Sequence, residues 1–153
     1  MRYLVTGGVG FLGTNLSLAL LRDGHEVVVL DNLSTAYNQN LDELSKYPSF
    51  SFVKCDIKDP IDITPKDFDF IYNMACPASP SKYQKKPVDT FRTSVWGIWN
   101  ILQLAKEARI PVLHTSTSEI YGDPLKHPQN EAYWGNVNPI GVRACYDEGK
   151  RAA

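Results

Sequence analysis

Tyr146 and Lys150, near the end of the sequence, are a pair of residues whose types and spacing suit acid–base chemistry. If their segment is helical, positions four residues apart share one face, so the phenol and the ammonium enter the same space. A nearby ammonium favours phenolate and would lower the pKa of the tyrosine from about 10 towards neutrality, which makes a general base. The same spacing is also typical of ordinary surface neighbours, so the rest of the sequence must decide between the two interpretations.

A second candidate is the hydroxyl-rich stretch 115–118, which is followed by Glu119. It begins within the segment 111–116, which we expect to be a strand. Hydroxyls at the end of a strand can bind a substrate, or they can cap the strand's own terminus. Both interpretations stay open on these residues alone.

The glycines of the segment 5–13 predict a dinucleotide site. Gly7, Gly10 and Gly13 stand between the apolar run 3–5 and a stretch of helical periodicity at 15–22. Such glycines allow a tight turn, close approach of a pyrophosphate, and close packing of helix on strand. The N-terminus of the following helix then offers free N–H groups to the phosphates.

Asp31 indicates which dinucleotide is bound. It follows the apolar run 27–30, eighteen residues after Gly13. A carboxylate there can accept both ribose hydroxyls of an adenosine. It would also repel the 2′-phosphate of NADP, and no Arg or Lys lies between Asp31 and Lys46 to neutralise it. We therefore predict NAD as the cofactor.

Strands and helices that alternate along the chain must position these residues. Apolar runs predict strands at 3–5, 27–30, 50–53, 68–73 and 111–116, and helical spacing predicts helices at 15–22, 41–46, 88–109 and from 142 onward. The intervening stretches 76–87 and 121–141 are expected to be loops. This order predicts an α/β fold, a Rossmann-like doubly wound parallel sheet, whose ligands bind beyond the carboxyl ends of the strands.

The helix 88–109 is expected to carry one apolar face. Its members are Phe91, Val95, Ile98, Trp99, Leu102 and Ala105. So many large apolar groups on one helix need cover, so we expect a homodimer or a larger association.

Composition limits the remaining possibilities. With 153 residues, 43% of them hydrophobic, a single domain with one core is expected. A net charge of −1 predicts neither a nucleic-acid nor a membrane partner, and Lys82, Lys85 and Lys86 are interpreted as a solvated loop. The cysteines and histidines show no metal-ligand spacing, and we expect free thiols. The first strand begins too early for a signal peptide, which favours a cytoplasmic location.

Longer motifs resemble a known family. Thr-Gly-Gly-x-Gly-Phe-Leu-Gly at 6–13, together with Tyr-x-x-x-Lys at 146–150, resembles the extended short-chain dehydrogenase/reductases, which act on nucleotide sugars. Within them, the segments 75–80, 115–124, 133–141 and 145–151 are similar to the UDP-glucuronate decarboxylases. The resemblance covers essentially the whole chain.

The resemblance implies a cofactor role for three groups of residues. For the pyrophosphate they are Gly7, Gly10, Phe11 and Leu12; for the adenosine they are Asp31, Asn32, Ser34, Thr35, Asp56 and Ile57; for the nicotinamide side they are Ala75, Thr93, Tyr146 and Lys150.

It also implies a reaction, the NAD-dependent decarboxylation of UDP-glucuronate to UDP-xylose through a 4-keto intermediate. Tyr146 would be the base and Lys150 would tune it, while Thr117 would hydrogen-bond the sugar and Glu119 would position the sugar or a water. The UDP-sugar would be bound by Pro77, Ala78, Ser79, Tyr83 and Gln84.

The chain departs from the family pattern in three places. Ser94 replaces an asparagine, Ala36 and Tyr37 replace a glycine and a basic residue, and the sequence ends three residues after Lys150. We therefore expect residues 1–153 to be a C-terminally truncated NAD-binding domain without its substrate lobe, inactive alone. Two alternatives stay open: another nucleotide-sugar epimerase or dehydratase of the family, although Ser118 in place of an acid disfavours dehydration, and a non-catalytic NAD-binding module.

Overall fold

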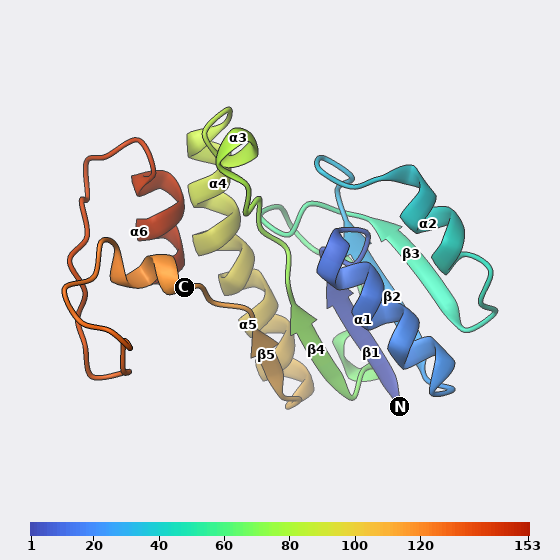
Figure 1. The fold of residues 1–153 in the computed structure, drawn as a ribbon. Coiled ribbons are helices and arrows are strands. Elements are labelled where there is room, and N and C mark those ends of the chain that lie inside the picture. The colour runs from blue at the N-terminus through green and yellow to red at the C-terminus, as the bar shows by residue number, and fades with distance from the viewer.

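The computed structural model describes residues 1–153 as a five-stranded parallel sheet with helices on both faces (Figure 1). The strand order is β3-β2-β1-β4-β5, so the chain moves outward from β1 to β3 and then returns past β1 to β4. This reversal is the switch point of a doubly wound sheet, and it confirms the predicted fold class. The strands are β1 (Arg2–Thr6), β2 (Glu26–Asp31), β3 (Phe50–Lys54), β4 (Phe70–Asn73) and β5 (Val112–His114).

The helices lie mostly where periodicity predicts them. They are α1 (Phe11–Arg22), α2 (Asn38–Leu44), α3 (Pro80–Tyr83), α4 (Pro87–Arg92), α5 (Ile98–Ala108) and α6 (Ala144–Ala152). Two 3₁₀ turns, η1 (Pro65–Asp67) and η3 (Ser118–Tyr121), and one π-helical turn, η2 (Thr93–Gly97), complete the elements. None of the helices is both long enough and apolar enough to cross a lipid bilayer.

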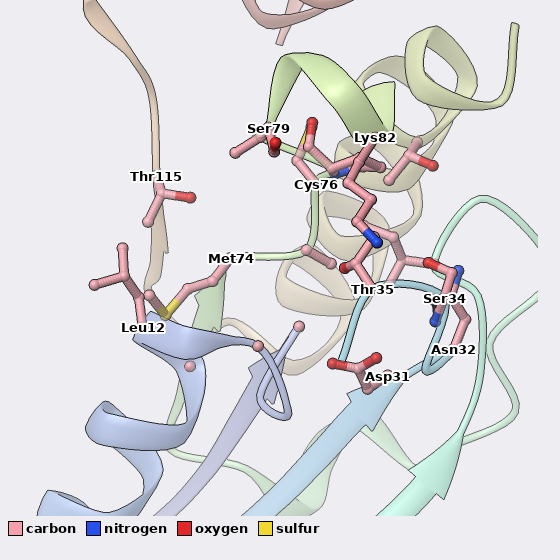
Figure 2. Close-up of a pocket in the computed structure, with 18 of the residues that line it drawn as sticks. Leu12, Asp31, Asn32, Ser34, Thr35, Met74, Cys76, Ser79, Lys82 and Thr115 are labelled. Carbon is pink, nitrogen blue, oxygen red and sulfur yellow. Dashed lines mark hydrogen bonds between the residues drawn. The ribbon is translucent and has the colours of Figure 1, made fainter. Parts of the chain in front are cut away.

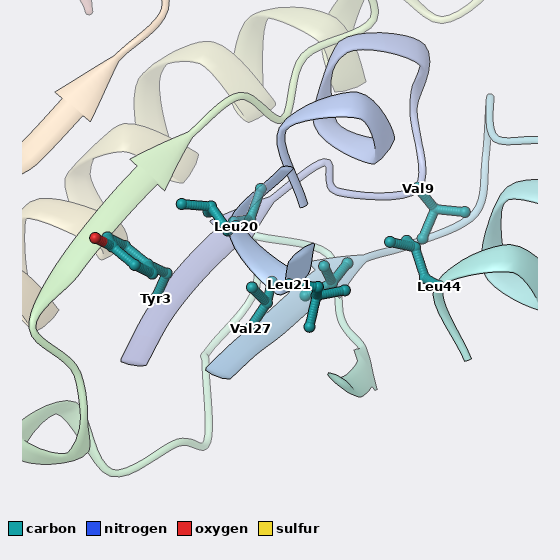
Figure 3. Packing of buried hydrophobic residues seen from close by; sticks show 8 residues of the cluster. Tyr3, Val9, Leu20, Leu21, Val27 and Leu44 are labelled. Carbon is teal, nitrogen blue, oxygen red and sulfur yellow. The ribbon is translucent and has the colours of Figure 1, made fainter. Parts of the chain in front are cut away.

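Alternation along the strands divides the core into two layers. Val27 and Val29 of β2 pack against α1 and α2, in the layer that Figure 3 shows. Val28 and Leu30 point to the other face and pack with Ile101 of α5. Because both faces of the sheet are covered, the central strands are apolar at nearly every position.

Two expected boundaries are corrected by the structure. α1 begins at Phe11, directly on the glycine loop, and its buried side includes Gly13, Ser17 and Leu20, whereas Ala19 is exposed. The loop expected at 76–87 contains the short helix α3. Pro80 at the first turn of α3 has the fixed φ that a helix start needs.

The apolar face expected for 88–109 is present in part, because Val95, Ile98, Trp99 and Leu102 line one apolar hollow. The π-helical turn η2 interrupts the expected helix between α4 and α5. Ala105 is buried in the core layer that α5 forms with the sheet, whereas Trp99 and Leu102 are 60% and 47% exposed. Gly97 allows the turn to pack closely, because a Cβ there would lie 2.6 Å from Cδ1 of Ile57.

Candidate cofactor and active site

A cleft of about 690 Å³ opens at the carboxyl ends of the strands, at the switch point (Figure 2). Most of the predicted site residues line it. These are Gly7, Gly10, Phe11, Leu12, Asp31, Asn32, Ser34, Thr35, Asp56, Ile57, Ala75, Pro77, Ala78, Ser79, Thr93, Tyr146 and Lys150.

The glycine loop leaves no room for side chains. Gly7 has φ +67°, and a Cβ there would lie 2.8 Å from Cα of Ala75. A Cβ on Gly13 would lie 2.2 Å from the carbonyl oxygen of Gly7. The N-terminus of α1 is thereby held against the turn, and its free N–H groups end in the cleft. This cradle fits the pyrophosphate of a dinucleotide.

A buried hydrogen-bond network fixes the strand ends beneath the cleft. Oγ1 of Thr6 donates to Oδ1 of Asn73 (2.6 Å) and accepts from the N–H groups of Met74 and Ala75 (3.1 Å each). Asn73 also contacts Nδ1 of His114 at 3.1 Å. Burial, helped by the charge of Lys150, lowers the pKa of His114 to about 4. The imidazole is therefore neutral at physiological pH, and it takes part in the hydrogen-bond network as an uncharged group.

Asp31 lies at the end of β2 with only 9% of its surface exposed. One carboxylate oxygen accepts from the N–H of Val9 (3.0 Å) and the other from the N–H of Leu33 (2.8 Å). Burial raises the pKa of Asp31 above its ordinary value. Each oxygen keeps lone-pair capacity for one more donor, so the pair suits two neighbouring hydroxyls.

Asp56 follows β3 and is held by two side chains. Its carboxylate accepts from Nδ2 of Asn32 (2.8 Å) and pairs with the ammonium of Lys58. Burial acts to raise the pKa of Asp56, but these contacts outweigh burial and keep it below its ordinary value. The carboxylate is therefore ionised at the cleft wall.

Tyr146 is buried at 6% exposure and stacks on Tyr83, with ring centroids 4.8 Å apart and planes 7° apart. The pKa expected from the sequence is wrong for this state: burial raises the pKa of Tyr146, and the Thr117 hydroxyl opposes the shift only in part. The ammonium of Lys150 donates to the carbonyl of Thr115 (2.5 Å). Burial lowers the pKa of Lys150.

Thr117 and Glu119 lie beside the cleft without lining it. Oγ1 of Thr117 accepts from the N–H of Glu119 (3.2 Å) and caps η3. The carboxylate of Glu119 forms an ion pair with Arg143, the residue just before α6. The pair ties the segment after β5 to the helix that carries Tyr146.

A family model described as GDP-mannose 4,6 dehydratase matches residues 4–153. The chain belongs to this family. Its similar curated relatives include UDP-glucuronic acid decarboxylases 1 and 6 of Arabidopsis thaliana, 52% and 51% identical over the whole chain, and UDP-glucuronic acid decarboxylase 1 of Danio rerio, 49% identical over 99% of it. The chain spans 34%, 44% and 36% of these relatives. The resemblance inferred from the motifs is thereby confirmed.

Solved structures of other proteins share this fold. The enzyme WbmG of Bordetella bronchiseptica in complex with NAD is 25% identical, with a TM-score of 0.82 over 99% of this chain and 47% of that one. UDP-N-acetylglucosamine 4-epimerase of Methanobrevibacter ruminantium M1 is 27% identical, with a TM-score of 0.81 over 97% and 46%.

Two residues predicted to bind the substrate, Tyr83 and Gln84, do not line the cleft. Tyr83 is 1% exposed beneath Tyr146, and Thr90 donates to its backbone carbonyl (3.0 Å). Its ring supports the Tyr146 phenol instead of facing the cleft, since an aromatic side chain at the end of α3 packs inward. Gln84 is exposed and does not line the cleft.

Sequence reasoning missed several residues that line the cleft of this family member. They are Tyr37, Met74, Cys76, Ser81 and Lys82, whereas Thr115 and Ser116, which also line it, belong to the hydroxyl-rich stretch that the sequence singled out. Lys82 corrects the interpretation of its cluster as a solvated loop, because it faces the cleft. Its position shortly after β4, a strand at the switch point, was the available signal. No group of His, Cys, Asp or Glu side chains forms a metal-binding cluster in the structure.

Proposed function

We propose that this chain provides the NAD site and the catalytic side chains of an enzyme that decarboxylates UDP-glucuronate to UDP-xylose. The observation that carries the proposal is the identity of about half of all residues, over the whole chain, with relatives described as UDP-glucuronic acid decarboxylases. Because the chain spans less than half of those relatives, the complete reaction is a proposal.

The cleft fits NAD on its own geometry. The glycine cradle and the N-terminus of α1 would hold the pyrophosphate, Asp31 the adenosine ribose, and Asp56 with Ile57 the adenine edge. Ala75 and Thr93 would lie along the nicotinamide, next to Lys150. Bound NAD would accept a hydride from the sugar and later return it, so the overall reaction is redox-neutral.

Tyr146 would take the proton from the hydroxyl on carbon 4 of the glucuronate as that carbon is oxidised. Its raised pKa favours the protonated phenol, so base catalysis depends on groups that stabilise phenolate in the loaded site. The Thr117 hydroxyl already acts in this direction, and Lys150 stands one helical turn away. Oxidation places the carboxylate beta to a ketone, so carbon dioxide can leave with the electrons taken up by an enolate.

Glu119 would position the sugar or the water that returns a proton to carbon 5. In the structure its carboxylate is paired with Arg143. This pair holds Glu119 at η3, the segment that follows β5, and ties it to the start of the helix that carries Tyr146. Ser118 offers no acid to expel a hydroxyl, which favours decarboxylation over dehydration.

We further propose a cytoplasmic homodimer. The three cysteines form no disulfide, as in a reducing compartment. An apolar hollow lined by Trp96, Trp99 and Leu102 of the α4–α5 region and by Ala152 of α6 lies open to solvent, and a second copy would cover it. Light scattering at tens of micromolar tests this, and a clean monomer would contradict it.

The reaction is tested with the protein expressed from the whole reading frame that contains these residues. UDP-glucuronate labelled with ¹³C at the carboxylate is mixed with NAD, and labelled carbon dioxide and UDP-xylose are followed by NMR. We expect both products. A 4-epimer without carbon dioxide would identify an epimerase instead, and intact NADH binding with no sugar product would identify a binding module.

A further inference from the structure

Lys82 places a cation in the cleft from the wall opposite β2. In Figure 2 its side chain extends from α3 towards the loop that carries Ser34 and Thr35. Its ammonium is exposed and belongs to none of the ion pairs of the structure. Its neighbour Lys85 is also exposed but does not line the cleft. Lys82 is therefore an uncommitted positive charge that a bound anion could meet.

The position of this charge bears on cofactor choice. Asp31 ends β2, and Ser34 and Thr35 follow it on the same loop, so Lys82 and Asp31 face one region of the cleft from two sides. Along the chain, the first cation after Asp31 is Lys46. The fold brings another from about fifty residues beyond Asp31, across the switch point.

We propose that Lys82 is a specificity-determining residue that offsets part of the repulsion between Asp31 and a phosphate on the adenosine 2′-oxygen. The proposal rests on NAD binding in this cleft. NADPH would then be a weaker second ligand rather than an excluded one. The two cofactors share the pyrophosphate and differ only in the 2′-phosphate, so a cation that serves the ribose side acts selectively on NADPH.

The test is a fluorescence titration of the 153-residue chain with NADH and NADPH. Lys82→Gln should raise the ratio of the NADPH Kd to the NADH Kd by about fivefold, mostly by weakening NADPH, as expected for one exposed charge pair. The effect should shrink at high salt. Lys82→Arg should keep the wild-type ratio, and the matched control Lys85→Gln should leave both affinities unchanged.

An unchanged ratio in Lys82→Gln, whether both affinities fall together or neither moves, would overturn the proposal. If NADPH binds the wild type too weakly to titrate, the same comparison is made in the Asp31→Ala background, where repulsion is absent and Lys82→Gln should still weaken NADPH. A wild type that binds neither cofactor would instead overturn the NAD site itself, so the two failures are distinguishable.

Discussion

The two ends of the cleft are built in different ways. The glycine-loop end consists of β1, the turn 7–10, α1 and β2, which follow one another in the sequence. Its strands are buried, with Leu4, Val5 and Val29 fully shielded from solvent. The tyrosine end consists of β5, η3 and α6, and its contacts join residues that are distant in the sequence, as between Lys150 and the carbonyl of Thr115.

The segment between η3 and α6 shows that the tyrosine end buries less apolar surface than the glycine-loop end. Trp134, Ile140 and Val142 are each more than 80% exposed. α6 packs against α4 and η2, with Tyr146 stacked on Tyr83, and it is tied to η3 by polar contacts from Arg143 to Glu119 and from Arg151 to the carbonyl of Ile120. A few such contacts are worth less than a packed core. The cofactor half is therefore fixed mainly by local sequence, whereas the catalytic half depends on packing and polar contacts between segments that are distant in the sequence.

The largest expected effect separates chemistry from binding. Tyr146→Phe removes the phenol oxygen but keeps the ring stacked on Tyr83. Turnover of UDP-glucuronate by the protein from the whole reading frame should fall about a thousandfold, the scale of general acid–base catalysis. NADH affinity and the free energy of unfolding should stay nearly unchanged. Near-normal turnover in this variant would remove Tyr146 from the mechanism.

At the glycine-loop end, one methyl group should be enough to destroy the site. The Cβ of Gly13→Ala would meet the carbonyl of Gly7, so we expect a loss of about 3 kcal/mol in the free energy of unfolding and loss of NADH binding. The control is Gly24→Ala, where φ is +80° but the space is open. It should cost about 1 kcal/mol and leave NADH binding intact. Urea unfolding and NADH titration measure both, and equal behaviour of the two variants would contradict close packing at Gly13.

This difference also explains what could be predicted from the sequence. The glycine loop, Asp31 and the order of strands and helices were predictable because each is a local pattern of residue types with one physical use. The Asp31 carboxylate accepts from the N–H of Val9, which belongs to the glycine loop, and from the N–H of Leu33, two residues further along the chain. Local chemistry and the final fold agree there.

For the tyrosine end, the sequence predicts which residues take part, but not how they are buried and paired. Nothing local shows that Tyr83 is buried under Tyr146, that Arg143 pairs with Glu119, or that Lys82 enters the cleft. The raised pKa of Tyr146 follows from burial, which depends on how α3 and α6 pack. The π-helical turn η2 interrupts the helix expected at 88–109, which a constant helical period does not predict.

His114 links the two ends through Asn73 and gives a pH prediction. Its pKa of about 4 in the folded chain is below the ordinary 6.5, so the unfolded chain binds the proton more readily. Its contribution to stability is full above about pH 6.5 and is lost as pH falls towards about 4. The full shift corresponds to about 3 kcal/mol, reduced to about 1–2 kcal/mol because the side chain is only part-buried.

Urea unfolding as a function of pH measures this contribution. The difference in unfolding free energy between wild type and His114→Gln should shrink as the pH falls through that window. Leu125→Gln, an exposed control without a titratable group, should give a difference that does not change. A pH-independent difference for His114→Gln would contradict a buried neutral imidazole.

The smallest expected effect concerns the ion pair of the tyrosine end. Arg143→Met should cost at most about 1 kcal/mol in the free energy of unfolding, because both partners are partly exposed. Lys46→Met, which removes the surface pair with Glu43, is the matched control and should cost less. A loss of several kcal/mol at Arg143 would show that this contact, rather than packing, holds α6.

The central claim is that the cleft at the switch point is an NAD site selected by Asp31. Titration of the 153-residue chain with NADH and NADPH, followed by fluorescence, tests it most directly. We predict saturable binding of NADH, about tenfold tighter than that of NADPH because the carboxylate repels the 2′-phosphate, and a smaller preference in Asp31→Ala. Equal affinities in the wild type, or a preference that Asp31→Ala leaves unchanged, would contradict it.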